Sequence, residues 1–303
     1  MTADDSKSCG SGEKICKSFC YGCSPVFEYD NYWVVAERYS SCKIANMKKI
    51  GFSLPPAYLA EQDISPEMVL VRALGQPREA LKRLKERGVT SIELRMVRPG
   101  MDPALAQAAI DNVINAGLGF TIHGLLPPSE DQTTSVEGFP SWDLSDIISE
   151  KQGDVTIPLH AKFRLEGKLE PVIADTIFAL RRLLEERDKR KAPFRFALEI
   201  NKSKAKVDPS FTWEGVSSIV EEVDHPALGI CWDFGHAHYN HRIGSISAEP
   251  PESFLQKVIH THIHDLSPED KTHWPLCEGV VPLSRNCELL QNVGYQGVYN
   301  LEL

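Results

Sequence analysis

The sequence contains no apolar run that approaches the ~20 residues needed to cross a bilayer, and its N-terminus lacks the apolar core of a secretory signal. It is also short of positive charge, with 33 Lys and Arg residues against 42 Asp and Glu residues and a net charge of −9. Phosphate neutralisation needs clustered cations, so this balance disfavours nucleic acid as a partner, although a local basic groove stays open. We therefore predict a soluble, cytoplasmic protein without a membrane partner.

Cysteine is scarce in most of the chain. Only Cys231, Cys277 and Cys287 follow residue 42, whereas the other five of the eight cysteines lie within residues 9–42. Residues 1–46 are otherwise rich in Ser, Gly and Lys, and Met47 begins a segment that runs directly into a predicted strand. This contrast predicts an N-terminal extension over residues 1–46, disordered or weakly structured, and one large domain over residues 47–303.

The extension carries one spacing with chemical meaning. Cys16, Cys20 and Cys23 form C-x₃-C-x₂-C, which resembles the motif that holds an iron–sulfur cluster in radical S-adenosylmethionine enzymes. No strand precedes the motif here, and Gly22 stands where an aromatic residue is usual. A zinc knuckle that also uses Cys9 is a second alternative. A disordered cysteine-containing tail is the interpretation we favour.

Short β-rich runs alternate with longer helical patterns from residue 48 onward. In the helical pattern over residues 170–191, Ile173, Ile177, Leu180 and Leu184 form an apolar stripe at helical period. Eight runs predict strands, at residues 49–54, 91–97, 119–125, 155–163, 194–200, 228–234, 257–265 and 297–303. Eight strands that alternate with helices favour a (β/α)₈ TIM barrel. An open doubly wound sheet is the alternative, but no Gly-rich phosphate loop follows the first strand.

The last predicted strand has no helix after it. The sequence stops at Leu303, within or just after that strand, whereas a complete barrel normally adds a helix that covers the eighth and first strands. We expect either a truncated barrel or an N-terminal extension that covers this seam. A non-catalytic, truncated barrel is therefore one of the functional alternatives.

Residue types that bind metal ions gather at the predicted carboxyl ends of the strands, where barrel enzymes keep their sites. They are His123, His160, Glu199, Asn201, Asp233, His236, His262, His264, His273 and Glu302. A single inward His is more often a hydrogen-bonded core residue than a ligand. Six successive strands carry such residues, however, and burying so many ionisable groups together is costly unless cations compensate them.

Five segments resemble the xylose isomerase-like superfamily of metal-dependent barrels, which includes sugar isomerases, ketose 3-epimerases and endonuclease IV. They are FALEIN around Glu199, CWDFGHAH around Asp233 and His236, HIHD from His262, HWPLCEG from His273 and NLEL around Glu302. The resemblance implies that Glu199, Asp233, His262 and Glu302 hold one divalent ion, and it assigns His236 to the substrate or to a second metal. Such a mixed oxygen and nitrogen set suits Mn²⁺, Co²⁺, Zn²⁺ or Mg²⁺.

The first reaction that the resemblance implies is isomerisation or epimerisation of a sugar or sugar phosphate, with a small carbohydrate as partner. Carboxylates on opposite sides of the substrate would exchange a proton beside a metal-polarised carbonyl. Glu199 and Glu302 inherit these catalytic roles, with His236 beside them. Glu93 resembles a common substrate-binding Glu of the group, and an ion pair with Arg95 is its alternative.

The second reaction is phosphodiester hydrolysis by several zinc ions, as in endonuclease IV. The matching extra histidines are His123 and His160 for one additional ion and His236 and His273 for a third. Two departures weaken this alternative, because Lys271 stands where the third-ion motif has Asp and Cys277 stands where it has Gly. Together with the net negative charge of the chain, these departures favour the isomerase or epimerase over the phosphodiesterase.

Three histidines alternate in the stretch VIHTHIHD, and alternate positions of a strand share one face. We expect His260 to be a packed interior residue and His262 to be the metal ligand. His264, with Asp265, is expected at the rim, where it would orient either the substrate or a group that supports the metal ligands. Trp274 is a candidate for stacking on a sugar. The sequence leaves open whether the chain forms a homo-oligomer.

Overall fold

A computed structural model describes residues 49–302, apart from residues 63, 67, 96, 98–100, 127–153 and 205. Its strands are β1 (Ile50–Leu54), β2 (Ser91–Leu94), β3 (Gly119–Ile122), β4 (Gly124–Leu125), β5 (Val155–His160), β6 (Phe194–Glu199), β7 (Leu228–Asp233), β8 (Val258–Ile263) and β9 (Tyr299–Leu301). They form one sheet in the order β3-β2-β1-β9-β8-β7-β6-β5-β4, and every paired strand is parallel to its neighbour. Each of the eight predicted strands therefore overlaps at least one strand of the structure.

His123 interrupts one of these strands. The sequence predicts a single strand over residues 119–125, but β3 ends at Ile122 and β4 begins at Gly124. β3 pairs with β2, and β4 pairs with β5. The two ends of the sheet order are thus consecutive pieces of one strand, which closes eight strand positions into a barrel. The predicted TIM barrel is confirmed.

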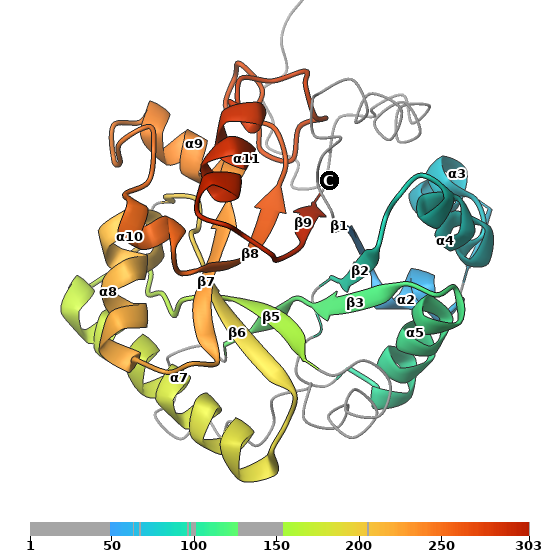
Figure 1. Ribbon diagram of the computed structural model, residues 1–303, viewed down its shortest axis with the longest axis horizontal. Helices are drawn as coiled ribbons and strands as arrows, with labels where there is room; N and C mark the ends of the chain where they lie inside the picture. The colour runs from blue at the N-terminus through green and yellow to red at the C-terminus, as the bar shows by residue number, and fades with distance from the viewer. Residues whose placement is uncertain are drawn as a thin grey trace, which may run out of the picture.

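Helices surround the strands (Figure 1). They are α2 (Pro56–Leu59), α3 (Val69–Leu74), α4 (Pro77–Glu86), α5 (Pro103–Asn115), α7 (Leu169–Arg190), α8 (Trp213–Val223), α9 (Phe234–Arg242), α10 (Glu252–Leu255) and α11 (Leu283–Asn292), with a 3₁₀ turn η4 at Pro209–Phe211. Among the described residues, no helix is long and apolar enough to span a membrane, and none follows β9. The cysteine motifs and the extension predicted over residues 1–46 lie outside the described residues.

Local sequence explains where the helices begin and which face they bury. Asp102 caps α5, since its side chain accepts a hydrogen bond from the Ala104 N–H at 2.9 Å, and Pro103 occupies the first helical position. In α7 the predicted stripe is confirmed at Leu180 and Leu184, which are buried, and is displaced by one residue in the first half of the helix. Ile173 and Ile177 are only partly buried, whereas Val172 and Thr176 are fully buried. The Thr176 hydroxyl donates to the Val172 carbonyl, which allows a polar side chain at this buried position.

The two faces of each strand differ sharply in chemistry. In β2, Ile92 and Leu94 belong to the hydrophobic core between sheet and helices, whereas Glu93 points to the opposite face. TIM barrels usually fill their interior with bulky branched side chains. Here the inward positions carry Ser, Thr, Asn, Glu, Asp and His instead: Ser53, Ser91, Glu93, Thr121, His123, Glu199, Asp233, His260, His262, Asn300 and Glu302, all buried. The barrel interior is therefore polar over much of its length.

Candidate metal centre

Glu199 and Asp233 end neighbouring strands, β6 and β7, and both side chains are fully buried. Asp233 also caps α9, because its Oδ1 accepts a hydrogen bond from the His236 N–H at 2.7 Å. The His236 ring turns back, so that its Nδ1 lies 3.2 Å from Asp233 Oδ2 and 3.5 Å from Glu199 Oε1. The D-x-x-H motif is thus a strand-to-helix turn that directs Asp233 and His236 toward Glu199.

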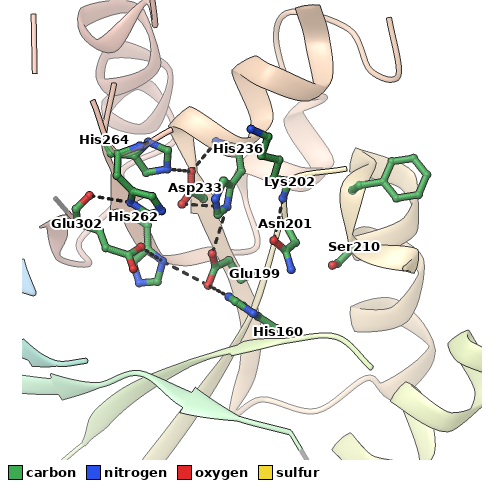
Figure 2. Close-up of polar contacts among 12 residues, drawn as sticks. His160, Glu199, Asn201, Lys202, Ser210, Asp233, His236, His262, His264 and Glu302 are labelled. Atoms are coloured by element: carbon green, nitrogen blue, oxygen red, sulfur yellow. Dashed lines mark hydrogen bonds and ion pairs between the residues drawn. The ribbon is translucent and has the colours of Figure 1, made fainter. Parts of the chain in front are cut away.

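His262 lies between two carboxylates from other strands (Figure 2). Its Nδ1 is 3.3 Å from Glu199 Oε2 and 3.3 Å from Glu302 Oε2. Its Nε2 lies 3.1 Å from Glu93 Oε1 on the other side of the ring. Burial alone would lower the pKa of His262, but Cys231, Glu93, Glu199 and Glu302 raise that pKa well above its ordinary value. The carboxylates around His262 therefore favour a positive charge at this end of the barrel.

Several buried polar atoms at this end of the barrel have no hydrogen-bond partner among the described residues: both Glu199 oxygens, Asp233 Oδ2 and His262 Nδ1. If the Nε2 proton of His262 is donated to Glu93, the Nδ1 lone pair faces two carboxylates, an arrangement that is repulsive without a cation. One ligand atom each from Asp233, His262 and Glu302 also lies within 4.8 Å of the others. The residues present therefore fit a divalent cation held by Glu199, Asp233, His262 and Glu302.

His123 and His160 lie next to the same glutamate. His160 Nε2 is 3.2 Å and His123 Nε2 is 3.6 Å from Glu199 Oε2. Both ring nitrogens of His123 are buried, and neither has a hydrogen-bond partner in the part of the chain that the structure describes. Burial opposes a charge on His160, yet Glu199 raises the pKa of this imidazole. Glu199 thus has His123 and His160 near one oxygen and His236 near the other, so nitrogen ligands for a second cation are present beside it.

His236, His264 and His273 form a third group of potential ligands. The prediction that His264 and Asp265 lie at the rim is wrong, because both are fully buried. His264 Nδ1 accepts the His273 N–H at 3.0 Å, and its Nε2 lies 3.1 Å from Asp233 Oδ1. The same Nδ1 lies 3.0 Å from the Asp265 carbonyl oxygen, and although burial opposes a charge, Asp233 and this carbonyl raise the pKa of His264. Burial and the neighbouring His264 lower the pKa of His273 to about 4, which keeps its imidazole neutral.

Gly235 is a site residue that the ligand pattern does not reveal. A Cβ atom at this position would lie 2.0 Å from His264 Cε1 and 2.2 Å from its Nδ1. We expect Gly235→Ala to displace the His264 ring from Asp233 and to destabilise the fold by roughly 1–3 kcal/mol, the usual cost of overpacking. Denaturant unfolding with and without the additional substitution His264→Ala tests this, because the cost should shrink once the ring is gone. An equal cost in both backgrounds would contradict the steric explanation.

Asp265 organises the loop that covers the end of β8. Its carboxylate accepts hydrogen bonds from the backbone N–H groups of Leu266, Cys277, Gly279 and Val281, at 2.8 to 3.0 Å. Its backbone also pairs with Trp274 through two 3.0 Å hydrogen bonds. Cys277 has a φ of 64°, a conformation that favours Gly, which accounts for the Gly expected there. The loop that holds His273 and Trp274 is therefore shaped by one buried carboxylate.

Replacing Asp265 with Ala should leave these backbone donors unsatisfied. We expect a loss of roughly 3–5 kcal/mol in the free energy of unfolding, the cost of removing one partner of a buried charged network. Limited proteolysis should then cut within residues 266–281 before any other described loop. The matched control is Asp154→Ala, at an exposed position directly before β5. Equal protease resistance in both variants would show that Asp265 does not hold the loop.

Glu93 lies behind His262, on the side away from Glu199 and Glu302. Its carboxylate is fully buried and accepts from Ser53 Oγ at 3.0 Å and, more weakly, Thr121 Oγ1 at 3.4 Å. His260 Nε2 approaches it at 2.8 Å, so His260 is the packed, hydrogen-bonded interior residue that the sequence predicts. The sequence offers an ion pair between Glu93 and Arg95 as an alternative. In the structure Arg95 Nη2 lies instead 3.6 Å from Glu302 Oε1.

Comparisons with known proteins agree with this architecture. The xylose isomerase-like TIM barrel family matches residues 81–303. An uncharacterised protein of Methanocaldococcus jannaschii is 33% identical over 98 residues, which span 30% of this chain and only 31% of that protein.

Two solved structures show the same fold at low identity. The 3-keto-D-glucoside 4-epimerase YcjR of E. coli has a TM-score of 0.58 at 18% identity, over 84% of this chain and 92% of that chain. The IOLI protein with a bound zinc atom has a TM-score of 0.55 at 16% identity, over 84% and 88% of the two chains. With 223 residues matched by the family description, this chain belongs to the xylose isomerase-like TIM barrel family.

Proposed function

We propose that the protein is a divalent-metal-dependent isomerase or epimerase of a sugar or sugar phosphate, which transfers a proton beside a carbonyl. The observation that carries this proposal is the convergence of Glu199 and Glu302, from two different strands, on the same nitrogen of His262. Two carboxylates at one cation site can serve both as ligands and as proton carriers. The epimerase activity named for the E. coli protein of the same fold supports the choice of substrate class.

Glu199, Asp233, His262 and Glu302 would hold the cation, with Mn²⁺, Co²⁺, Zn²⁺ or Mg²⁺ as candidates. When bound, a divalent cation supplies Lewis-acid polarisation of a carbonyl and its neighbouring hydroxyl. The zinc atom in the IOLI structure supports a metal in a protein of this fold. The binding chemistry of the site is therefore suited to substrates that carry adjacent oxygen atoms.

The two glutamates would carry the proton. One carboxylate removes a proton from the carbon beside the carbonyl, and the other returns a proton to the opposite face or to the neighbouring carbon. Arg95 Nη2, 3.6 Å from Glu302 Oε1, compensates the charge on that carboxylate. His236 lies near both Asp233 and Glu199 and can orient a substrate hydroxyl. Trp274 and His264 stay candidates for substrate contact, and Glu93 is better suited to orienting His262.

Proton exchange with solvent gives the most direct test. The full chain, loaded with each of the four metals, is incubated in D₂O with a panel of ketoses, aldoses and their phosphates. We expect deuterium at the carbon beside the carbonyl of at least one sugar, together with an isomeric product. A metal-loaded protein that exchanges no proton of any sugar in the panel but cleaves an abasic-site oligonucleotide would refute the proposal.

A multi-zinc phosphodiesterase is the second candidate, and the histidines beside Glu199 favour it. His123 and His160 add two nitrogen ligands at a carboxylate that already faces the first cation site, and two-metal sites with a shared ligand suit phosphodiester hydrolysis. This candidate requires at least two ions per chain and a loss of one ion in His160→Ala. A chain that retains less than one divalent ion after metal-replete expression would contradict both enzymes and favour a non-catalytic barrel.

A further inference from the structure

The amino-terminal end of the barrel is hollow. A cavity of about 650 Å³ opens there, and its lining includes Ser91 and Gly119, the first residues of β2 and β3, and Arg195, the second residue of β6. The candidate metal ligands lie at the other ends of the strands, as Glu199 does on β6. The cavity is therefore separate from the site described above.

Three small hydroxyl-bearing side chains and one arginine line this space. Ser91, Thr121, Thr156 and Arg195 line the cavity, and strand alternation puts them on the same inward face as Glu93, His123, His160 and Glu199, respectively. Barrels of this type usually fill these layers with Val, Ile or Leu. Hydroxyl groups in their place give the cavity hydrogen-bond donors, and a volume of this size is typical of small-molecule sites.

The charged groups at the cavity are mainly positive. Within the part of the chain that the structure describes, the half-buried Arg195 side chain has neither an ion-pair partner nor a hydrogen-bond partner. Lys49 also lines the cavity, and it is exposed. Asp154 is the acidic residue of the lining, and it too is exposed. The half-buried guanidinium therefore lacks the compensating anion that such a group normally has.

Ser91 points to a ligand independently of the charges. Its Oγ is buried and finds no hydrogen-bond partner within the described ranges of the chain, and the residue is only 7% exposed. Buried hydroxyls nearly always have a partner in the protein or in bound molecules. Thr121, by contrast, already donates its hydroxyl to Glu93. Ser91 is thus a residue with an unsatisfied hydroxyl in the wall of the cavity that also holds the uncompensated arginine.

We propose that this cavity is a second binding site, which takes the phosphate group of a small metabolite. The Arg195 guanidinium pairs with two phosphate oxygens, the geometry for which its planar fork is suited. The Ser91 hydroxyl donates to the anion, and Lys49 adds a second positive charge at the opening. The site goes beyond the proposed function and does not depend on it, because it uses none of the metal-centre residues.

Equilibrium dialysis of the metal-free full chain tests the proposal. Removing metals with a chelator leaves the carboxylate-rich end of the barrel without a cation to attract anions. The probes are inorganic phosphate and glycerol 3-phosphate, which distinguish a free phosphate ion from a phosphate ester. We expect saturable binding of one molecule per chain, tighter for the ester if the rest of the cavity takes part.

Arg195→Gln should weaken this binding at least about tenfold, as expected for the loss of a charged hydrogen-bond partner. The matched control is Arg182→Gln, which removes an exposed arginine of α7 and should leave binding unchanged. Lys49→Gln, at an exposed position, and Ser91→Ala give smaller losses, and they keep the test decisive if Arg195→Gln folds poorly. The absence of saturable binding of either probe up to about 10 mM, or unchanged binding in all three cavity variants, would overturn the proposal.

Discussion

Glu199→Gln is expected to abolish turnover, with kcat/KM reduced by at least about 1,000-fold. The substitution keeps the shape of the side chain but removes the charge, so one proton carrier and one metal ligand are lost together. Glu199 is also the residue that contacts most of the site, since His123, His160, His236 and His262 all lie within 3.6 Å of its two oxygens. Among the described residues, no other carboxylate lies close to all four of these rings.

The measurements that check this result are the rate of deuterium incorporation into the best sugar substrate and the metal content of the purified variant. Glu185→Gln is the matched control, because Glu185 is an exposed residue of α7 far from the strand ends. Full activity of Glu199→Gln at unchanged metal content would show that the metal centre is not where the chemistry occurs.

Glu93→Gln should weaken metal binding by about 10- to 100-fold, although Glu93 is not itself a proposed ligand. Its carboxylate fixes the proton of His262 on Nε2 and so directs the Nδ1 lone pair toward the cation. A glutamine side chain has no charge to offset this imidazole, and its NH₂ group can face the imidazole N–H. A competition titration against a chromophoric chelator gives the affinity for each metal.

A purely structural role for Glu93 would lower stability without changing the metal affinity of the folded protein. We therefore expect kcat to recover at saturating metal concentration, which separates a positioning role from a direct one. Ser53→Ala is the control within the same network, because it removes one neutral hydrogen bond to the carboxylate and should have a much smaller effect. If Glu93→Gln binds metal as tightly as the unmodified chain, His262 is oriented by other contacts.

The strand pattern could be predicted because each strand of the barrel is short and apolar on its outer face. The position of Glu199, Asp233 and His262 at strand ends followed from the same pattern, since alternation and strand direction fix which side chains share one end. The break at His123 could not be predicted. Residues 119–125 have an ordinary strand sequence, and the interruption arises because their two halves pair with different neighbours.

Partners that are distant in sequence account for the other failures. Glu93 and His260 are 167 residues apart, and only closure of the barrel brings them together. His264 and Asp265 look like rim residues because they follow β8, but the loop over residues 266–281 folds back across them through the Asp265–Trp274 bridge. The loop is held by backbone N–H groups that donate to the Asp265 carboxylate. Because every residue except proline has such a donor, the residue types of the loop do not predict this arrangement.

The break at His123 also bears on motion. One strand position of the barrel is shared between β3, which is paired with β2, and β4, which is paired with β5, so neither half is hydrogen-bonded on both sides by described strands. Local opening starts where backbone hydrogen bonding is sparse. Amide protons of residues 119–125 should therefore exchange with solvent faster than those of β6 and β7. A cation bound between His123 and Glu199 would slow that exchange. It would link the strand position that is paired on one side only to β6, which is paired with a strand on each side.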